Sequence, residues 1–301
     1  MPTLNFATRP SRLAGIQTDS IRSALQKKWP ELNCTVTVIR TEGDRVLDRP
    51  LPDIGGKGLF TKELERELLE GRLDAAVHSL KDLPIEDVPG LAIGLIPERA
   101  IANDVLISRG GYTLEELPAG SVLGTSSLRR QGQVLAYRPD LEVRSLRGNV
   151  DTRVRKVQEG EYDAAILAHA GLARLDLSEH MAQVLPLDIV LPAPGQGALA
   201  VQCRSDDYET LSHLAAFEDA LTRTAVEAER RFLAALGGGC SLPVGAYAEK
   251  RNGSWTMSAV IVAPDGAELL RLQSAGEDPD VLVEELILEA EAGGALKVLH
   301  G

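Results

Sequence analysis

The stretch LPAPGQG at residues 191–197 is the strongest linker signal in the chain. Proline and glycine interrupt helices and strands, so we expect no regular structure there. Directly after it, residues 198–203 again have the pattern of a strand. With a second linker expected near residues 97–103, the chain leaves one α/β unit, builds another and returns to the first. Two such crossovers form a hinge, and a ligand is then expected between the units, at the carboxyl ends of strands.

Upstream of residue 191, short apolar strands alternate with amphipathic helices, which is typical of a mostly parallel sheet covered on both faces. In the first unit we expect strands at Leu4–Thr8, Cys34–Arg40 and Asp74–Val77, and helices at Ser11–Trp29 and Leu59–Glu70. In the second unit we expect strands at Asp104–Ser108, Ser121–Gly124, Leu141–Leu146 and Ala164–Ala168, and helices at Ser126–Ala136 and Val150–Glu159.

The last eighty or so residues have a different character. A long helix near residues 220–236 runs into GGGC (residues 237–240), and the turn signals NG (252–253) and PDG (264–266) predict antiparallel hairpins before a final helix near 278–292. The predicted fold class is α/β, with two hinged, periplasmic-binding-protein-like α/β domains and a small carboxy-terminal α+β domain. The expected boundaries are 1–98 with 198–217, 103–192, and 220–301.

Composition narrows the functional classes. The chain has 301 residues, of which 44% are hydrophobic and 25% charged, and no apolar run is long enough to span a membrane. The amino terminus lacks the apolar core of a secretory signal, so we expect a cytoplasmic protein, and a monomer. Three cysteines without ligand spacing predict neither disulfides nor a metal site. A net charge of -12 with 4% aromatic residues argues against nucleic acid as a partner.

Positive charge is nevertheless concentrated between residues 122 and 155, where seven arginines and no lysine occur against three acidic residues. Arginine forks bind carboxylates or phosphates through two hydrogen bonds at once. Within this window, GTSSLRR (124–130) follows a predicted strand and begins a predicted helix, so hydroxyls, backbone N–H groups and two arginines converge on one helix terminus. A salt-bridged helix face is the alternative for any one arginine, but the cluster predicts an anion site.

Two further segments carry chemistry. In AVHSLKDLP (76–84), Asp82 follows a buried strand, and among arginines it would stay ionised and could stabilise a cation or pass a proton; a turn aspartate before proline is the alternative. In GGGC, glycines leave Cys240 open to approach, which suits a reactive thiol, although a buried strand residue is the alternative. We expect Cys34 and Cys203 to be buried.

Six segments together resemble the hydroxymethylbilane synthase (porphobilinogen deaminase) family in order and spacing. They are GGKGLF (55–60), AVHSLKDLP (76–84), GTSSLRR (124–130), RSLRGNVDTR (144–153), LPAPGQG (191–197) and GGGC (237–240). The resemblance spans essentially the whole chain.

This resemblance implies a transferase that condenses four porphobilinogen molecules, with loss of ammonia, on a dipyrromethane cofactor held by a thioether at Cys240, and then releases linear hydroxymethylbilane by hydrolysis. It implies Asp82 as the catalytic residue. The implied cofactor-binding residues are Cys240, Lys81, Asp44, Thr125, Ser127, Arg129, Arg130, Arg147 and Arg153. The implied substrate-binding residues are Arg9, Ser11, Lys57, Phe60 and Arg174.

Two other readings of the same residues remain. Two hinged α/β domains also suit a protein that binds a dicarboxylate without turnover, although such receptors are usually exported. A thiol-dependent acyl transferase could use Cys240 with His78, and it would carry a free thiol open to alkylation.

Overall fold

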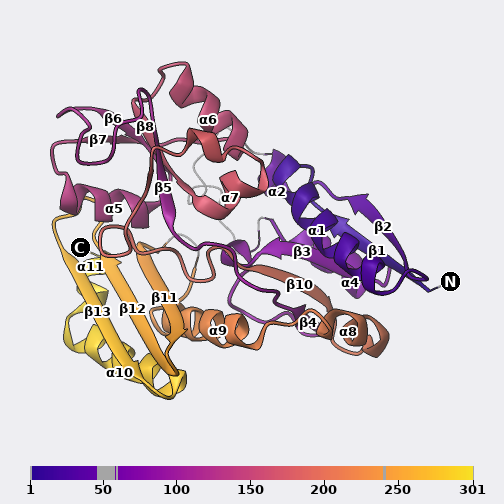
Figure 1. The fold of residues 1–301 in the computed structure, drawn as a ribbon. Coiled ribbons are helices and arrows are strands. Elements are labelled where there is room, and N and C mark those ends of the chain that lie inside the picture. The colour runs from indigo at the N-terminus through magenta and orange to yellow at the C-terminus, as the bar shows by residue number, and fades with distance from the viewer. Residues whose placement is uncertain (1, 46–57, 59, 240–241, 301) are drawn as a thin grey trace. The chain divides into compact units, whose positions relative to one another are not determined.

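The computed structural model describes residues 2–45, 58, 60–239 and 242–300, without the side chains of residues 45 and 300. Its contacts divide the chain into two compact units (Figure 1). Unit 1 comprises Met1–Arg99 and Ala198–Arg223, and unit 2 comprises Ala100–Gly197 and Thr224–Gly301. The chain changes unit at residues 99–100 and 197–198, inside or directly after the two predicted linkers. Residues 224–301 fall in the same unit as residues 100–197, and the finer division into three domains stays a prediction.

Unit 1 is built on a five-stranded sheet of order β2-β1-β3-β10-β4. The strands are β1 (Thr3–Thr8), β2 (Asn33–Val38), β3 (Ala75–Ser79), β4 (Leu91–Leu95) and β10 (Leu199–Arg204). The helices are α1 (Arg12–Lys28), α2 (Glu42–Arg45), α4 (Lys62–Leu69) and α8 (Tyr208–Ala215), with the 3₁₀ turn η1 (Leu80–Asp82).

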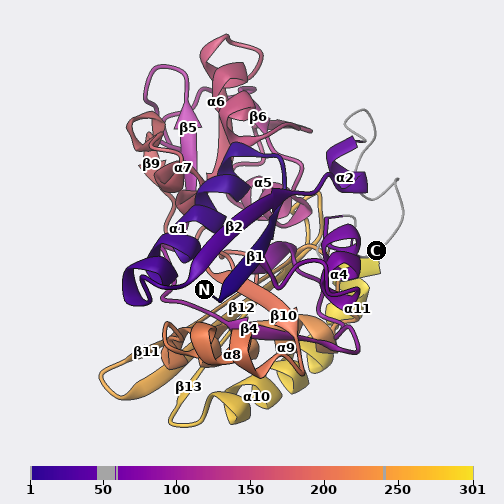
Figure 2. The same ribbon diagram turned by 90° about the vertical axis from the view of Figure 1, so that its right-hand side faces the viewer.

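Helices cover both faces of this sheet. Because successive side chains of a strand point to opposite faces, one strand contributes to the core on each side. On β1, Phe6 joins the core cluster that contains Leu25 of α1, whereas Ala7 joins the cluster that contains Leu64 and Leu68 of α4. Figure 2 shows α1 and α4 on opposite sides of β1. The expected α/β layering is confirmed in this unit.

Unit 2 contains a second five-stranded sheet, of order β7-β6-β8-β5-β9. The strands are β5 (Asp104–Ser108), β6 (Val122–Gly124), β7 (Glu142–Arg144), β8 (Ala164–Ala168) and β9 (Gln183–Val184). The helices are α5 (Leu128–Tyr137), α6 (Val150–Gln158) and α7 (His169–Arg174), with η2 (Ser178–His180). Val134 of α5 packs with Leu123 and Ile166 on one face, and Val154 of α6 packs with Val105 and Leu167 on the other.

The two sheets have the same strand pattern. Three parallel strands, β2-β1-β3 or β7-β6-β8, are followed by a strand that runs antiparallel to both of its neighbours, β10 or β5. In each sheet the antiparallel strand is the first strand after the chain crosses from the other unit. It runs opposite to the three parallel strands of that sheet. A mostly parallel sheet was expected, and these two strands are the difference.

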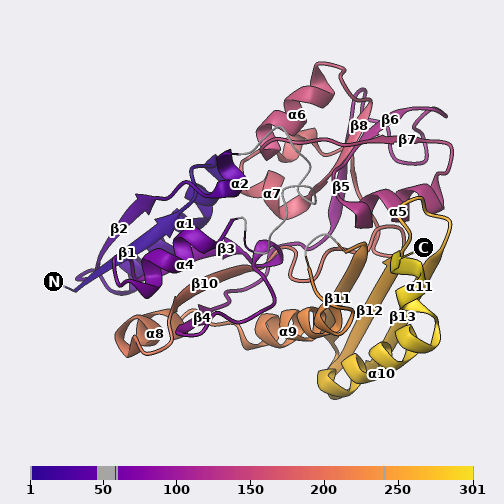
Figure 3. The ribbon, with the colours of Figure 1, turned by 180° about the vertical axis from the view of Figure 1, so that it is seen from behind.

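Unit 2 also holds the three-stranded antiparallel sheet β11-β12-β13. Its elements are α9 (Ala220–Ala235), whose first residues belong to unit 1, then β11 (Val244–Arg251), β12 (Ser254–Val262), β13 (Leu269–Gly276), α10 (Pro279–Ala292) and α11 (Ala295–His300). Asn252 and Gly253 both have positive φ, 52° and 87°, as a two-residue type I′ turn requires. Figure 3 shows α10 alongside β12 and β13. The predicted fold class, two α/β sheets and a small antiparallel sheet, is confirmed.

Among the described residues, no helix is both long enough and apolar enough to cross a membrane.

Candidate functional site

Several predicted site residues of each unit follow the carboxyl ends of its parallel strands. In unit 1, Arg9 and Ser11 follow β1, while Lys81 and Asp82 follow β3, which pairs in parallel with β1. In unit 2, Thr125 follows β6 in the same way. Because parallel strands end at the same edge of a sheet, each unit gathers its polar side chains along one edge, where ligands of α/β folds bind.

Arg9 is held from two sides in unit 1. Its guanidinium donates to the carboxylate of Asp44 at 2.5 Å and 3.3 Å, and its Cζ atom lies 4.1 Å from the ring centroid of Phe60. Thr41 donates to Asp44 through its backbone N–H at 3.1 Å and its hydroxyl at 2.8 Å. Burial alone would raise the pKa of Asp44, but the hydrogen bonds and charge of Arg9 and the bonds from Thr41 together lower it. Asp44 is therefore an ionised anchor for Arg9.

Ser11 is the N-cap of α1, and its hydroxyl oxygen accepts a hydrogen bond from the backbone N–H of Ala14 at 3.2 Å. This bond satisfies one of the unpaired N–H groups of the first helical turn. The helix thus holds Ser11 two residues after Arg9, at the same sheet edge.

Asp82 lies on the short turn η1 between two buried anchors, Leu80 and Leu83. The backbone N–H of Leu80 donates to Ala198 O at 3.0 Å, which fixes the turn to the start of β10. Lys81 is half-buried, whereas Asp82 is exposed. Among the described residues, the Asp82 carboxylate has neither a hydrogen bond nor an ion pair. A carboxylate on a rigid turn with no protein partner is available to a substrate.

His78 lies on β3 and is 6% exposed. Burial and the positive charge of Arg9 lower its pKa from 6.5 to about 4, so the imidazole is neutral near pH 7. Its Nε2 atom is buried and has no hydrogen-bond partner. The acyl-transferase reading needs this ring beside Cys240, which lies outside the described residues, as does Lys57.

In unit 2, Thr125 and Ser127 connect β6 to α5. The backbone N–H of Ser127 donates to Oγ1 of Thr125 at 3.2 Å, and Thr125 is buried. Ser127 is the N-cap residue of α5, yet its side chain makes no capping hydrogen bond. Its hydroxyl is therefore not used to stabilise the helix end, unlike that of Ser11.

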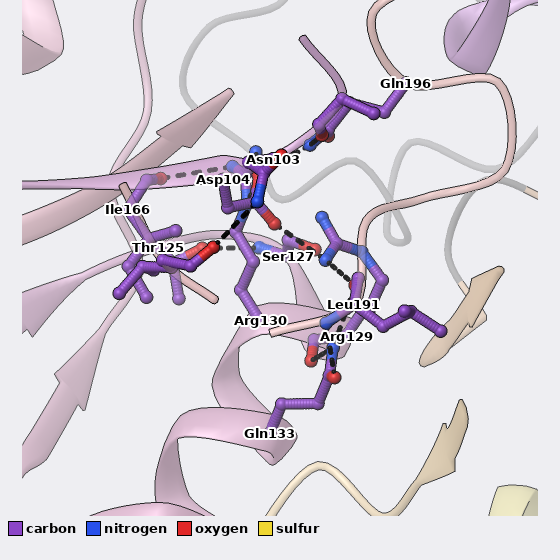
Figure 4. A network of polar contacts seen from close by, with 12 residues as sticks. Asn103, Asp104, Thr125, Ser127, Arg129, Arg130, Gln133, Ile166, Leu191 and Gln196 are labelled. Carbon is purple, nitrogen blue, oxygen red and sulfur yellow. Dashed lines mark hydrogen bonds and ion pairs between the residues drawn. The ribbon is translucent and has the colours of Figure 1, made fainter. Parts of the chain in front are cut away.

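Arg129 and Arg130 share one buried carboxylate, that of Asp104 at the start of β5 (Figure 4). Nη1 of Arg129 lies 2.7 Å from Oδ2, and Nη2 and Nε of Arg130 lie 2.7 Å and 3.1 Å from Oδ1. Arg129 is 3% exposed, Arg130 is 6% exposed and Asp104 is fully buried. Two guanidiniums facing one carboxylate leave one positive charge in excess within a buried cluster.

The linker 191–197 is tied into this cluster. Leu191 O accepts from Nη1 of Arg129 and, at 3.1 Å, from Nε2 of Gln133. Gln196 donates to Oδ1 of Asp104 at 2.8 Å and to Ala102 O at 2.7 Å. The predicted crossover is therefore held in part by Arg129, which was predicted to bind a ligand.

The three other predicted site arginines of unit 2 differ in their partners. Nη1 of Arg147 is buried without a hydrogen-bond partner. Nε of Arg153 donates to Gly148 O at 2.8 Å, and Nη2 of Arg174 donates to Gly197 O at 2.9 Å. Burial lowers the pKa of Arg174. An orphaned guanidinium atom and an uncompensated positive charge both favour an anionic ligand here, since buried charge is costly without a partner.

No cluster of three or more histidine, cysteine or acidic side chains that could hold a metal ion occurs in the described part of the chain.

Comparison with known proteins identifies the family. Residues 4–212 match the family model "Porphobilinogen deaminase, dipyromethane cofactor binding domain", and residues 223–291 match "Porphobilinogen deaminase, C-terminal domain". The chain belongs to the porphobilinogen deaminase family. The expected family and its dipyrromethane cofactor are thereby confirmed.

Relatives within the porphobilinogen deaminase family are similar over almost their full length. Porphobilinogen deaminase of Brevibacillus brevis is 50% identical over 293 residues, covering 96% of this chain and 95% of that protein. The one from Desulforudis audaxviator is 50% identical over 294 residues, covering 97% and 95%. Among solved structures, the periplasmic VFT2 domain of Bordetella pertussis BvgS is 14% identical, with a TM-score of 0.42 over 71% of this chain and 85% of that domain.

The residues of unit 2 fit the cofactor that the porphobilinogen deaminase family uses. A pyrrole chain carries carboxylates on every ring, and the arginine cluster offers excess positive charge at one sheet edge. The arginines were predicted from the sequence, whereas Asp104 and Gln196 were not. The available signal was a carboxylate directly before the apolar run VLI (105–107) of a predicted strand, because a buried carboxylate requires a cationic partner.

Proposed function

We propose that this chain is a hydroxymethylbilane synthase, a transferase that condenses four porphobilinogen molecules on a dipyrromethane primer and releases the linear tetrapyrrole. Family membership supports the reaction class. The observation that supports the site is the buried cluster of Arg129, Arg130 and Asp104, which keeps one positive charge in excess at the sheet edge where Arg147 has an unpartnered guanidinium atom.

The primer would be held by a thioether to Cys240 and would supply a free pyrrole α-carbon as the nucleophile. Thr125, Ser127, Arg129, Arg130, Arg147 and Arg153, together with Lys81 and Asp44, would hold and orient it, the guanidiniums and the lysine by binding its acetate and propionate groups. Guanidinium forks suit this task because they bind carboxylates in bidentate geometry and do not lose their charge near neutral pH.

Arg9, Ser11, Lys57, Phe60 and Arg174 would bind the incoming porphobilinogen. The stacking of Arg9 on Phe60 and its bonds to Asp44 fix the guanidinium before the substrate arrives. A preformed donor loses less conformational entropy on binding than a flexible one.

Asp82 would act on the substrate itself. As ammonia leaves porphobilinogen, positive charge develops on the pyrrole, and an ionised carboxylate nearby stabilises it. After the new carbon–carbon bond forms, the α-carbon loses its proton, and the same carboxylate can accept that proton. Asp82 is exposed on η1 and has no hydrogen bond or ion pair with another described residue, which suits both steps.

The proposal includes a cytoplasmic monomer that needs no metal ion. Light scattering of the purified protein and turnover after treatment with a chelator test the last two points directly.

The central experiment combines intact mass under denaturing conditions with an assay of porphobilinogen consumption. We expect the active wild type to be heavier than its sequence by two pyrrole units, and Cys240→Ala to lack that mass. An unmodified chain that consumes porphobilinogen contradicts the covalent primer. A chain that binds porphobilinogen without releasing ammonia instead indicates a binding protein.

A further inference from the structure

We propose that Asp104 is a positioning residue of this reaction, which orients Arg129 so that a free edge of its guanidinium receives a carboxylate of the primer. The inference deepens the proposed function and rests on it. Asp104 would not touch the primer, because its two oxygens already accept hydrogen bonds from Arg129, Arg130 and Gln196.

The two arginines use their donors differently. All three nitrogens of Arg130 donate within the protein, Nε and Nη2 to Asp104 and Nη1 to Ile166 O at 3.1 Å. Within the described part of the chain, Arg129 donates through Nη1 alone, to Asp104 and to Leu191 O. Nε and Nη2 of Arg129 have no hydrogen-bond acceptor among residues 2–45, 58, 60–239 and 242–300. These two nitrogens form one edge of the guanidinium, the edge that a carboxylate binds in bidentate geometry.

Asp104 fixes which edge is free. Its Oδ2 atom accepts a hydrogen bond from Nη1 of Arg129. Because the guanidinium is rigid and planar, the edge formed by Nε and Nη2 then points away from Asp104. Arg130 and Gln196 hold Oδ1, so the carboxylate cannot rotate without breaking three hydrogen bonds. An arginine without this partner would sample many rotamers, and ordering it would cost affinity for each bound carboxylate.

The charge of Asp104 is permanent near neutral pH. Burial alone would raise its pKa, but the charges of Arg129 and Arg130 and their hydrogen bonds hold it far below the ordinary value of 3.8. One negative charge against two positive charges orders the pair without neutralising it. A primer carboxylate at the free edge of Arg129 would then complete the charge balance.

A double-mutant cycle tests this inference. The cycle compares wild type with Asp104→Asn, Arg129→Gln and the double variant. Apoprotein is incubated with porphobilinogen, and the fraction of chains that carry the two-pyrrole mass is followed over time to give the initial rate of primer loading. We expect Asp104→Asn to lower the initial rate of primer loading about tenfold in the wild-type background, as loss of a charge-assisted bond does. In the Arg129→Gln background the same substitution should slow loading by a clearly smaller factor, because only the contribution that Asp104 makes through Arg130 is left.

Asp163→Asn is the matched control. Asp163 immediately precedes β8 of the same sheet, at its opposite edge, and its carboxylate accepts from the backbone N–H of Val122 at 2.7 Å. The variant also removes one negative charge from unit 2, so unchanged loading there separates the effect of Asp104 from net charge. Equal losses from Asp104→Asn in both backgrounds, or no loss in either, overturn the inference. A wild type that never gains the two-pyrrole mass overturns the proposed function itself.

Removal of a buried ion-pair partner can prevent folding, so Gln196→Leu provides a second route. It keeps the carboxylate and both arginines but removes one hydrogen bond that holds Oδ1. We expect slower loading by about tenfold, the effect of one hydrogen bond to a charged acceptor, and a smaller loss in the Arg129→Gln background. A folded Gln196→Leu chain, verified by circular dichroism, that loads at the wild-type rate counts against the inference.

Discussion

Nη2 of Arg9 lies 2.5 Å from Oδ1 of Asp44, and the same guanidinium stacks 4.1 Å from the centre of the Phe60 ring. A carboxylate on one side and an aromatic face on the other leave few orientations for the side chain. The free donors of Arg9 are therefore directed before any ligand arrives.

Asp44→Asn should raise the KM for porphobilinogen by about tenfold, because a charge-assisted hydrogen bond contributes about 1.5–3 kcal/mol. The loss should fall mainly on KM, since Arg9 binds substrate rather than transferring protons. Steady-state kinetics on primed protein measures this. Asp19→Asn is the control, because the Asp19–Arg22 pair at 3.0 Å lies on the exposed side of α1, and its kinetics should match the wild type.

Asp82→Ala should keep the two-pyrrole mass but lose turnover by about 10²- to 10⁴-fold, the usual contribution of a group that transfers a proton in the transition state. The exposed position of Asp82 means that its removal leaves no cavity, so the melting temperature should stay near that of wild type. Asp87→Ala, an exposed carboxylate five residues further along, serves as the control. Turnover close to wild type in Asp82→Ala would remove this residue from the mechanism.

His78 predicts a pH dependence of stability. Its folded-state pKa of about 4 lies below the ordinary value of 6.5, so the unfolded chain binds the proton first. Stability should therefore be unaffected by this group above pH 6.5 and fall as the pH drops from 6.5 towards 4, by about 3 kcal/mol in total. Urea unfolding at pH 7 and pH 5 should show about 2 kcal/mol of this loss.

The side chain of His78→Gln cannot titrate. The free energy of unfolding of this variant should therefore fall by about 2 kcal/mol less than that of wild type between pH 7 and pH 5, whatever its stability at pH 7. An unchanged slope in His78→Gln would show that another group carries the effect.

Gly132 on α5 predicts a packing effect within unit 2. A Cβ atom there would overlap the carbonyl oxygen of Ala263 and lie 2.8 Å from a methyl carbon of Val262, so α5 and the antiparallel sheet would have to separate. Gly132→Ala should destabilise the protein by about 1–3 kcal/mol. Gly15→Ala on α1, where the added atom meets nothing within 4 Å, should instead stabilise by about 0.5–1 kcal/mol. Thermal unfolding compares the two.

Much of the fold followed from local sequence patterns. Strand β8 was predicted at its observed bounds, and the Asn252–Gly253 turn was predicted because few other dipeptides adopt positive φ at both positions. Strands β4 and β9 were not predicted, since each depends on a neighbour in its sheet rather than on its own pattern. The antiparallel direction of β10 and β5 likewise depends on which strand the crossover reaches.

The sequence by itself determined the order of elements, the two crossovers, and the residue types that gather at the sheet edges, because these depend on interactions within a few residues. The tertiary structure alone decided how those residues are paired. Asp104 binds Arg129 across 25 residues of sequence and Gln196 across 92, and no local pattern encodes such a contact. Burial of two guanidiniums required a carboxylate, and only the folded sheet determines which carboxylate lies within reach.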